Sequence, residues 1–442
     1  CCGSHVIRRV TLTIRKIEQG LLDAGHEVCI LTTNSGNPAN TNLYVGQHPG
    51  RQVMFLDEAS VSPFSIQPDP NNKDISYYMG VSLSRGQKLK LDAFQPTLVH
   101  ITAPDKVCLH LVQHALERQI PLMGTYHSNL PDYLAYYPVL SVIKPFLIAY
   151  LGHLYSSLQR LYVPTPFTRQ QVVDQYAYGV DNIDIWGRGV DLTKFNPSLR
   201  SNAWRRSLGI TESEVVVSWV GRLFPEKRTD IFAKVIRRLH TEGVRFRALV
   251  IGDGPCKEEM KNLPNTQFLG WMNVTDLAVA YASSDVFLFP SAVETFGNVT
   301  LEAAASGVPV VVESGCSGHV VRNNVTGFAC QLDDVDDYYN ATYKLVTDHE
   351  FRRKLSKASR EFSLNFENTK VVKQMIQNYE DVTEEFCTEL GGNHSTRNEK
   401  IRRAMSRRSY AQVFFLYVTL FVFALLSLLT EFLALYSNLK HL

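Results

Sequence analysis

Two acidic and two basic residues in the second half of the sequence could together bind a phosphorylated sugar. Glu294 lies in a loop after an apolar strand, and Glu302 lies about one turn inside the helix that follows. Carboxylates at such positions accept paired hydrogen bonds from sugar hydroxyls. Arg222 and Lys227 follow another apolar strand, and a guanidinium fork with an ammonium suits a diphosphate. Each residue alone could also be a solvated surface charge or a helix-capping acid.

Glycines at the ends of predicted strands could let a ligand approach the backbone. Gly221, Gly252 and Gly254 each follow an apolar strand, although Gly-Asp-Gly-Pro is as often a plain turn. A further helix is expected to begin near Gly297 and Asn298. The N–H groups at a helix start have no partner within the helix, so they favour negative or hydroxyl-rich ligands.

Four segments, in order along the chain, resemble elements of glycosyltransferase family 4, a large family of retaining enzymes with the GT-B fold. ETFGNVTLE at 294–302 resembles the family's E-x7-E element, and GRLFPEK at 221–227 resembles its phosphate loop. The segments 124–133 and 186–191 resemble two further elements, above all in the branch of lipid mannosyltransferases and sulfoquinovosyltransferases. The resemblance covers roughly residues 3–385.

The resemblance implies a function for particular residues. Those implied in catalysis are His127, Arg222, Lys227 and Glu294. Those implied in donor binding are Gly3, Gly221, Arg222, Lys227, Gly252, Gly254, Glu294, Phe296, Gly297, Asn298 and Glu302.

The resemblance implies that different residues of these sets bind different parts of the donor. The cations would bind the diphosphate and Glu302 the ribose hydroxyls, while Glu294 and the amides of residues 296–298 would hold the transferred sugar. His127 matches a histidine of the cleft near the sugar, and its place directly after a strand favours that role over a structural one. Arg188 and Asp191 are weaker candidates, because each could simply shape the turn into the linker.

The expected chemistry needs no metal and no cofactor besides the nucleotide sugar, which is a co-substrate. Negative charge that builds up on the departing diphosphate would be stabilised by Arg222, Lys227 and the helix N-terminal amides. The acceptor hydroxyl would attack from the face that the diphosphate leaves. Asp334 and Asp336 form a D-x-D pattern, but acids at the start of a predicted helix more simply cap that helix.

Short apolar strands that alternate with amphipathic helices predict an α/β protein. The resemblance implies two doubly wound Rossmann-like domains facing a cleft, the GT-B fold. We expect an N-terminal acceptor-side domain over residues 1–195 and a nucleotide-sugar-binding domain over residues 196–385. No strand precedes the first helical pattern, so an upstream strand is expected to be missing from this chain.

Residues 411–435 form a predicted transmembrane helix, because residues 411–430 carry no charge and suffice to cross a hydrocarbon core of about 30 Å. A polar and then basic linker, 386–410, precedes it and places the catalytic domains on the cytosolic side. The endoplasmic reticulum is the default membrane. The tether favours a lipid or glycolipid acceptor. The apolar segment 133–154 could face that acceptor or membrane, or could be a core helix.

Composition narrows the remaining function classes. The net charge of +2 gives no support for nucleic-acid binding. The eight cysteines show no metal-ligand or CxxC spacing, so a zinc site is not expected, and reduced thiols are expected in preference to disulfides. Two alternatives stay open: an inactive, membrane-anchored GT-B scaffold or regulatory subunit, and another GT-B enzyme such as a sugar-nucleotide epimerase or a glycan phosphorylase.

Overall fold

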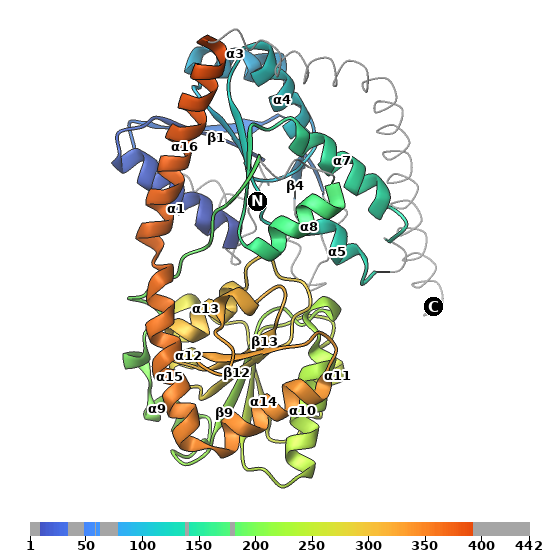
Figure 1. Cartoon of the computed structure of the whole chain (residues 1–442), viewed down its shortest axis with the longest axis vertical. Coiled ribbons are helices and arrows are strands. Elements are labelled where there is room, and N and C mark those ends of the chain that lie inside the picture. Colours follow the sequence, from blue (N-terminus) through green and yellow to red (C-terminus); the bar gives the residue numbers. More distant parts are fainter. Residues whose placement is uncertain are drawn as a thin grey trace, which may run out of the picture.

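Two α/β domains lie one above the other along the long axis of this computed structural model (Figure 1). The structure describes residues 9–33, 48–57, 59–61, 78–137, 141–176 and 182–391. The predicted donor-loop residue Gly3, the predicted membrane helix and all of the linker after residue 391 lie outside the described residues.

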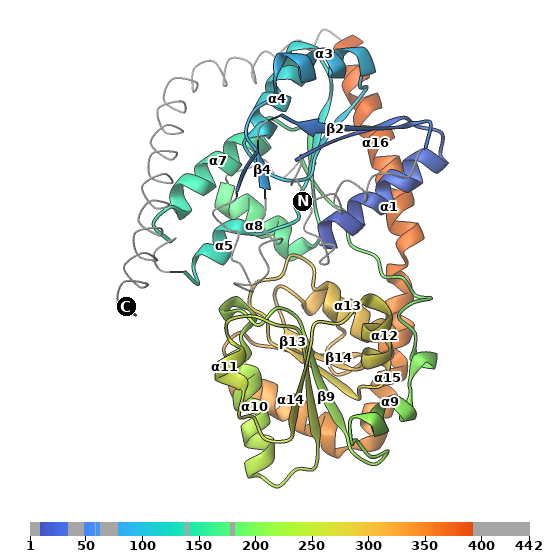
Figure 2. The same cartoon turned by 180° about the vertical axis from the view of Figure 1, so that it is seen from behind.

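The first domain is built from short strands with helices around them (Figure 2). Its described strands form a four-stranded parallel sheet in the order β5-β6-β7-β8, a parallel pair β1-β2 and an antiparallel pair β3-β4. The elements are α1 (Arg9–Asp23), β1 (Val28–Thr33), β2 (Arg51–Leu56), β3 (Ala59–Val61), β4 (Tyr78–Gly80), α3 (Arg85–Phe94), β5 (Val99–Ile101), α4 (Val107–Glu117), β6 (Leu122–Thr125), α5 (Leu130–Leu134), α7 (Lys144–Ser156), β7 (Arg160–Val163), α8 (Pro166–Tyr176) and β8 (Ile183–Ile185).

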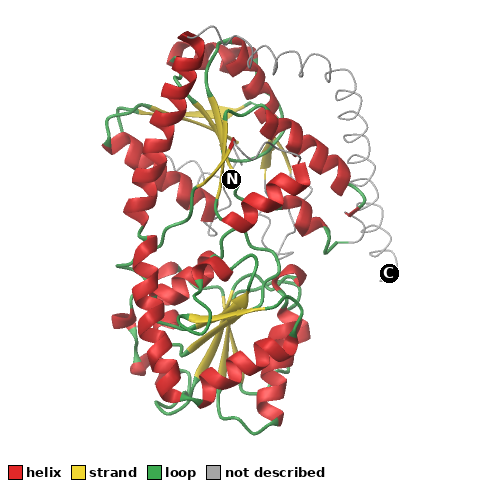
Figure 3. Ribbon diagram, in the orientation of Figure 1, coloured by secondary structure: helices red, strands yellow, loops and turns green. Residues whose placement is uncertain are grey.

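The second domain holds one six-stranded parallel sheet in the order β11-β10-β9-β12-β13-β14, with helices on both faces (Figure 3). Strand order reverses between β9 and β12, which is where open sheets of this kind bind ligands. The strands are β9 (Val216–Val220), β10 (Arg247–Ile251), β11 (Thr266–Gly270), β12 (Val286–Phe289), β13 (Val310–Glu313) and β14 (Gly327–Cys330). The helices are η3 (Pro197–Leu199), α9 (Asn202–Ser207), η4 (Pro225–Lys227), α10 (Thr229–Thr241), α11 (Lys257–Met260), α12 (Val274–Ala282), α13 (Asn298–Ala305), η5 (Gly318–Val320), α14 (Val335–Thr347), α15 (His349–Ser363), η6 (Leu364–Phe366) and α16 (Asn368–Gly391).

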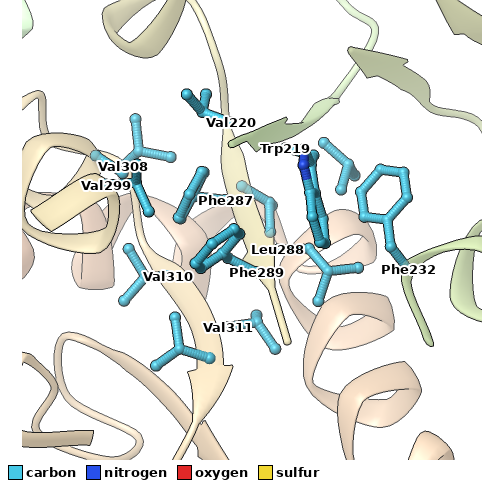
Figure 4. Close-up of a cluster of buried hydrophobic side chains, with 14 of the residues drawn as sticks. Trp219, Val220, Phe232, Phe287, Leu288, Phe289, Val299, Val308, Val310 and Val311 are labelled. Carbon is cyan, nitrogen blue, oxygen red and sulfur yellow. The ribbon is translucent and has the colours of Figure 1, made fainter. Parts of the chain in front are cut away.

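Aromatic side chains fill the core of the second domain (Figure 4). The ring of Trp219 lies 5.0 Å from that of Phe289 and 5.4 Å from that of Phe232, measured between centroids, and all three side chains are buried. Trp219 belongs to β9 and Phe289 to the neighbouring β12. Because close packing of large side chains fixes the two strands relative to each other, it also fixes the loops that leave them.

The chain passes between the domains twice, and the two passages lie side by side. The N–H of Val190 donates to the carbonyl of Phe366 (2.7 Å), and the N–H of Asn368 donates to the carbonyl of Val190 (3.2 Å). Only a glycine fits at Gly189, where a Cβ would lie 2.7 Å from the Cα of Asn368. Beyond this crossing, α16 returns to the first domain (Figure 1), where Met375 joins a cluster of its buried residues.

Within the described part of the chain, no helix combines the length and the apolar character that a membrane span needs. The apolar segment 133–154 divides between two environments. Leu151 and Leu154 of α7 are fully buried in the core of the first domain, whereas Val142, just before that helix, is 68% exposed. Leu151 and Leu154 therefore pack in the core, whereas Val142 places an exposed apolar side chain just before α7.

Candidate active site

Lys227 and Glu294 meet at the carboxyl ends of two adjacent strands. Lys227 closes the 3-10 turn after β9, and its Nζ donates to Oε1 of Glu294 (2.7 Å) and to the carbonyl of Val293 (2.9 Å). Burial alone would lower the pKa of Lys227, but the carboxylate of Glu294 and the phenol of Tyr133 outweigh it and raise that pKa above its usual value. The buried ammonium therefore stays charged.

Arg222 lies on the same loop as Lys227 and faces the solvent. Its side chain is 64% exposed, and Nη2 lies 3.6 Å from Oε1 of Glu226. The guanidinium also lies 4.8 Å from the ring centroid of Phe224. Glu226 itself is buried and accepts a hydrogen bond from the hydroxyl of Tyr137 in the first domain (3.4 Å). Much of the guanidinium is thus open to an anion that enters from solvent.

The loop from Glu294 to α13 has a conformation that requires glycine at one position. Gly297 caps the helix with φ +79°, and a Cβ there would lie 2.8 Å from Oγ of Ser317. Phe296 is buried with its ring 4.5 Å from the ring of His319. Asn298 begins α13, so the first N–H groups of the helix lie directly after Glu294 in the chain.

Glu302 lies inside α13 as predicted and is held by the neighbouring helix. The hydroxyl of Tyr281 on α12 donates to Oε2 of Glu302 (3.3 Å). The glutamate is partly buried. A hydroxyl partner of this kind restricts the rotation of the carboxylate, which favours binding of a rigid hydroxyl pair.

The predicted ligand glycines Gly252 and Gly254 are required by the backbone of the adjacent loop. A Cβ at Gly252 (φ +135°) would lie 1.9 Å from the carbonyl oxygen of Gly221, and one at Gly254 (φ +154°) would lie 2.4 Å from that of Leu223. The N–H of Leu223 also donates to the carbonyl of Asp253 (2.9 Å). These glycines thereby shape the loop that carries Arg222. Their contact with a donor stays a prediction.

His127 occupies the loop after β6, and both of its ring nitrogens have partners. Nδ1 lies 3.0 Å from Nη2 of Arg188, and Nε2 lies 2.8 Å from Oγ1 of Thr125. Burial, Arg188 and His100 together hold the pKa of His127 well below its usual range. The imidazole is therefore neutral and has no nitrogen available to take a proton from a substrate.

The first domain contacts the donor loop of the second at several points. The ring of Tyr133 lies 5.6 Å from Nζ of Lys227. Oγ1 of Thr295 donates to the carbonyl of His127 (3.1 Å), and Oγ1 of Thr168 donates to the carbonyl of Thr295 (3.2 Å). The predicted residues His127, Lys227 and Glu294 are thus linked across the domains. Sequence reasoning missed Thr295, although it directly follows a predicted site residue.

The D-x-D pattern caps a helix, as the sequence predicted. Oδ1 of Asp334 accepts from the N–H of Asp337 (3.0 Å) at the start of α14, and Asp336 forms an ion pair with Arg238. Among the residues that the structure describes, no group of three or more potential metal ligands occurs.

Comparison with known proteins defines the class to which this chain belongs. Residues 10–194 match the family model of Glycosyltransferase Family 4, and residues 200–362 match that of the Glycosyl transferases group 1. The two matches meet near the predicted domain boundary and together cover most of the chain. The chain belongs to glycosyltransferase family 4, which confirms the resemblance seen in its motifs.

Individual relatives are similar over much of their length. The chain is 31% identical to the Sulfoquinovosyl transferase SQD2 of Arabidopsis thaliana over 349 residues, 77% of this chain and 64% of that protein. It is 29% identical to a GDP-mannose-dependent alpha-mannosyltransferase of Mycolicibacterium smegmatis over 345 residues, 77% of this chain and 84% of that protein. The chain thus spans less than two thirds of the plant relative.

Solved structures confirm the predicted GT-B architecture of the two domains. The sucrose-phosphate synthase of Thermosynechococcus elongatus superimposes with a TM-score of 0.66 at 19% identity, over 85% of this chain and 94% of that one. Anabaena HepE in complex with UDP-glucose superimposes with a TM-score of 0.65 at 16% identity, over 86% and 98% of the two chains. At these identities the likeness extends to the fold alone.

Proposed function

We propose that this glycosyltransferase moves a hexose-type sugar from a UDP- or GDP-linked donor to a membrane lipid or glycolipid, with retention of anomeric configuration. One observation carries the proposal: the charged Lys227 lies 2.7 Å from Glu294, on the loop that also presents Arg222 to solvent. The names of the relatives, a sulfoquinovosyl transferase and a GDP-mannose-dependent enzyme, support a nucleotide-linked hexose as donor.

Lys227 and Arg222 can stabilise the negative charge that the reaction creates on the leaving diphosphate. When the bond between the anomeric carbon and the diphosphate breaks, negative charge moves to the phosphate oxygen. A buried ammonium and an exposed guanidinium on one loop can stabilise that charge without reorganisation. No metal ion is needed in this scheme, because Lys227, Arg222 and the amides at the start of α13 supply the positive potential.

The two glutamates would hold the sugars on either side of the diphosphate. Glu294 accepts from Lys227 and from Oγ of Ser291 (3.1 Å), both through Oε1, so its orientation is set before the donor arrives. Its other oxygen can accept from hydroxyls of the transferred sugar. Glu302, oriented by Tyr281, would accept from the ribose hydroxyls.

Retention follows from a same-face attack. The acceptor oxygen bonds to the anomeric carbon as the phosphate oxygen leaves, and the acceptor proton passes to that phosphate oxygen. His127 supports this route, because a neutral ring with both nitrogens engaged does not serve as the base. The predicted membrane helix at 411–435 supports a lipid acceptor, since a tether raises the local concentration of headgroups.

A donor screen on the full-length protein in phospholipid vesicles tests the proposal. Thermal stability is measured with a panel of UDP- and GDP-linked hexoses, and the stabilising donor is then incubated with candidate lipids. Proton NMR of the first product formed reads the anomeric configuration. We expect one donor to stabilise the protein and to give a product of unchanged configuration. Absence of both binding and transfer would overturn the proposal, and an inverted product would overturn its mechanism.

A further inference from the structure

We propose that Arg188, Thr125, His100 and Tyr379 are positioning residues that fix the tautomer and the orientation of His127 where the two domains meet. Together with His127 they form a continuous series of side chains, called here the His127 row. The proposal rests on the proposed function only in placing His127 beside the reacting sugar.

Four contacts build the row. Nη2 of Arg188 lies 3.0 Å from Nδ1 of His127, and Nε2 of His127 lies 2.8 Å from Oγ1 of Thr125. Oγ1 of Thr125 lies 2.9 Å from Nε2 of His100, and Nδ1 of His100 lies 2.7 Å from the hydroxyl oxygen of Tyr379. All four distances fall within the range of ordinary hydrogen bonds.

Hydrogen-bonding chemistry fixes the position of the proton on His127, and the proposal assigns one direction of donation along the rest of the row. A guanidinium only donates, so Nδ1 of His127 must accept, and the ring proton of this neutral histidine lies on Nε2. That proton is donated to Thr125, whose single hydroxyl proton is then donated to Nε2 of His100. His100, whose pKa burial and Arg188 lower to about 3, therefore carries its proton on Nδ1 and donates it to Tyr379.

The row joins the contact of His127 with the second domain to the crossing between the domains. Arg188 lies in the passage from the first domain to the second, and Tyr379 lies on α16, which returns from the second domain to the first. At the other end of the row, the backbone carbonyl of His127 accepts from Oγ1 of Thr295, next to Glu294 in the chain. The row therefore lies beside the loop that carries Glu294.

Arg188 is a buried cation whose hydrogen-bond partners in the described part of the chain are all neutral. They are the carbonyls of Trp186 (3.1 Å), Gly187 (3.2 Å) and Tyr126 (3.2 Å), and the ring of His127. Among the described residues, no carboxylate lies within ion-pair distance of it. Burial lowers the pKa of Arg188 to about 9, so the guanidinium is still mostly charged at neutral pH.

The charge of Arg188 determines how His127 responds to pH. Within the described ranges, the titratable and charged groups that face His127 are Arg188, from the interdomain passage, and His100, from β5. Tyr379 of α16 faces His100 in turn. Neither of these two groups favours a second proton on His127. Removal of Arg188 would take away both the donor to Nδ1 and the nearest positive charge.

Nitrogen-15 NMR of histidine-labelled full-length protein in detergent micelles tests the row without any substrate. His127→Gln and His100→Gln assign the two signals. We expect His127 protonated on Nε2, His100 protonated on Nδ1, and no titration of either between about pH 8 and pH 5. Opposite tautomers, or titration of His127 near its ordinary pKa in the wild-type protein, would overturn the proposal whatever the enzyme transfers.

Variants add a functional readout. Arg188→Met is expected to raise the pKa of His127, because the nearest positive charge is removed while burial remains, and to lower sugar transfer by roughly tenfold to a hundredfold. Arg188→Lys keeps the charge and a donor, so it is expected to restore part of the low pKa of His127 and part of the sugar transfer. The matched control is Arg169→Met, because Arg169 donates to a backbone carbonyl, that of Ile183 (3.1 Å), outside the row.

Two outcomes separate this proposal from the proposed function. If the predicted tautomers are observed but no sugar is transferred, the row stands and the proposed function fails. If transfer occurs but Arg188→Met changes neither the His127 signal nor the pH profile relative to Arg169→Met, the row is merely structural and the proposal is wrong. If Arg188→Met does not fold, the tautomers of His127 and His100 in the wild-type protein still test the proposal.

Discussion

The Nζ atom of Lys227 lies 2.7 Å from Oε1 of Glu294, so the cation suited to a phosphate and the acid suited to a sugar form one ion pair, and Tyr133 of the other domain lies beside it. Both residues follow the carboxyl ends of neighbouring strands, β9 and β12. A donor can enter this pair by placing its phosphate on the ammonium and its sugar on the carboxylate. Binding then exchanges one set of charged contacts for another.

Removal of the Lys227 charge should abolish most of the activity. Lys227→Met is expected to lower kcat/KM for the donor by roughly a hundredfold to a thousandfold, because one preorganised stabiliser of the leaving phosphate is lost. Lys234→Met is the control, since Lys234 is 56% exposed on α10 and forms an ion pair with Asp230 of the same helix. Steady-state transfer by the two variants is compared, and equal rates would remove Lys227 from the mechanism.

Arg222 should matter for binding and hardly at all for folding. Its side chain is 64% exposed, so Arg222→Ala is expected to change the free energy of unfolding by less than ~0.5 kcal/mol. The affinity for the donor should fall by about tenfold, as for the loss of one charged hydrogen bond. Arg206→Ala on α9 is a control of similar exposure. Calorimetric titration measures the affinity, and an unchanged donor affinity in Arg222→Ala would contradict its assignment.

Gly252 should be needed for the close approach of two loops and not only for its backbone angle. Gly252→Ala places a Cβ 1.9 Å from the carbonyl oxygen of Gly221, whereas Gly243, which also has a positive φ (+73°), has nothing within 4 Å of such a Cβ. Gly252→Ala should therefore lower the free energy of unfolding by clearly more than the roughly 1 kcal/mol expected for Gly243→Ala. Urea unfolding compares the two, and equal losses would rule out the clash.

Buried neutral histidines should make the protein sensitive to acid. The pKa of His100 is lowered to about 3 by burial and by Arg188, below the value of about 6.5 expected in the unfolded chain. As pH falls from about 6.5 toward 3, His100 binds a proton in the unfolded state but not in the folded state. The free energy of unfolding therefore declines by up to ~1.4 kcal/mol per pH unit.

His100→Gln removes this contribution and should flatten the dependence of unfolding free energy on pH between 6.5 and about 4. His349→Gln is the control, because His349 is exposed on α15. The measurement is urea unfolding at a series of pH values. A slope that is the same in both variants would show that His100 carries no depressed pKa.

The family resemblance of the motifs, added to the local pattern, predicts the convergence of Lys227 and Glu294, since either residue alone could be a surface charge. Each follows a short apolar strand, and parallel strands with helical crossovers end at one edge of a sheet. The loop glycines show the limit of the same reasoning. A glycine after a strand can serve a ligand or a neighbouring backbone, and the approach of Gly252 to Gly221 depends on sheet order, which no local pattern contains.

Long-range pairing explains what the sequence could not supply. Arg188 is a weaker candidate from the sequence because it could simply shape the turn into the linker, yet in the folded chain it reaches His127, 61 positions earlier. Tyr379 and His100 are 279 positions apart, and they meet only because α16 crosses back to the first domain. Thr125 lay inside a predicted motif, but its two histidine partners come from different segments.

Titration calorimetry of nucleotide sugars into the full-length protein tests the central claim most directly. One UDP- or GDP-linked hexose should bind the wild-type protein and Lys234→Met with equal affinity. The same donor should bind Lys227→Met at least tenfold more weakly, and Glu294→Gln should also weaken it, while circular dichroism shows both variants folded. Equal donor affinity in the wild-type protein and in Lys227→Met would contradict the account.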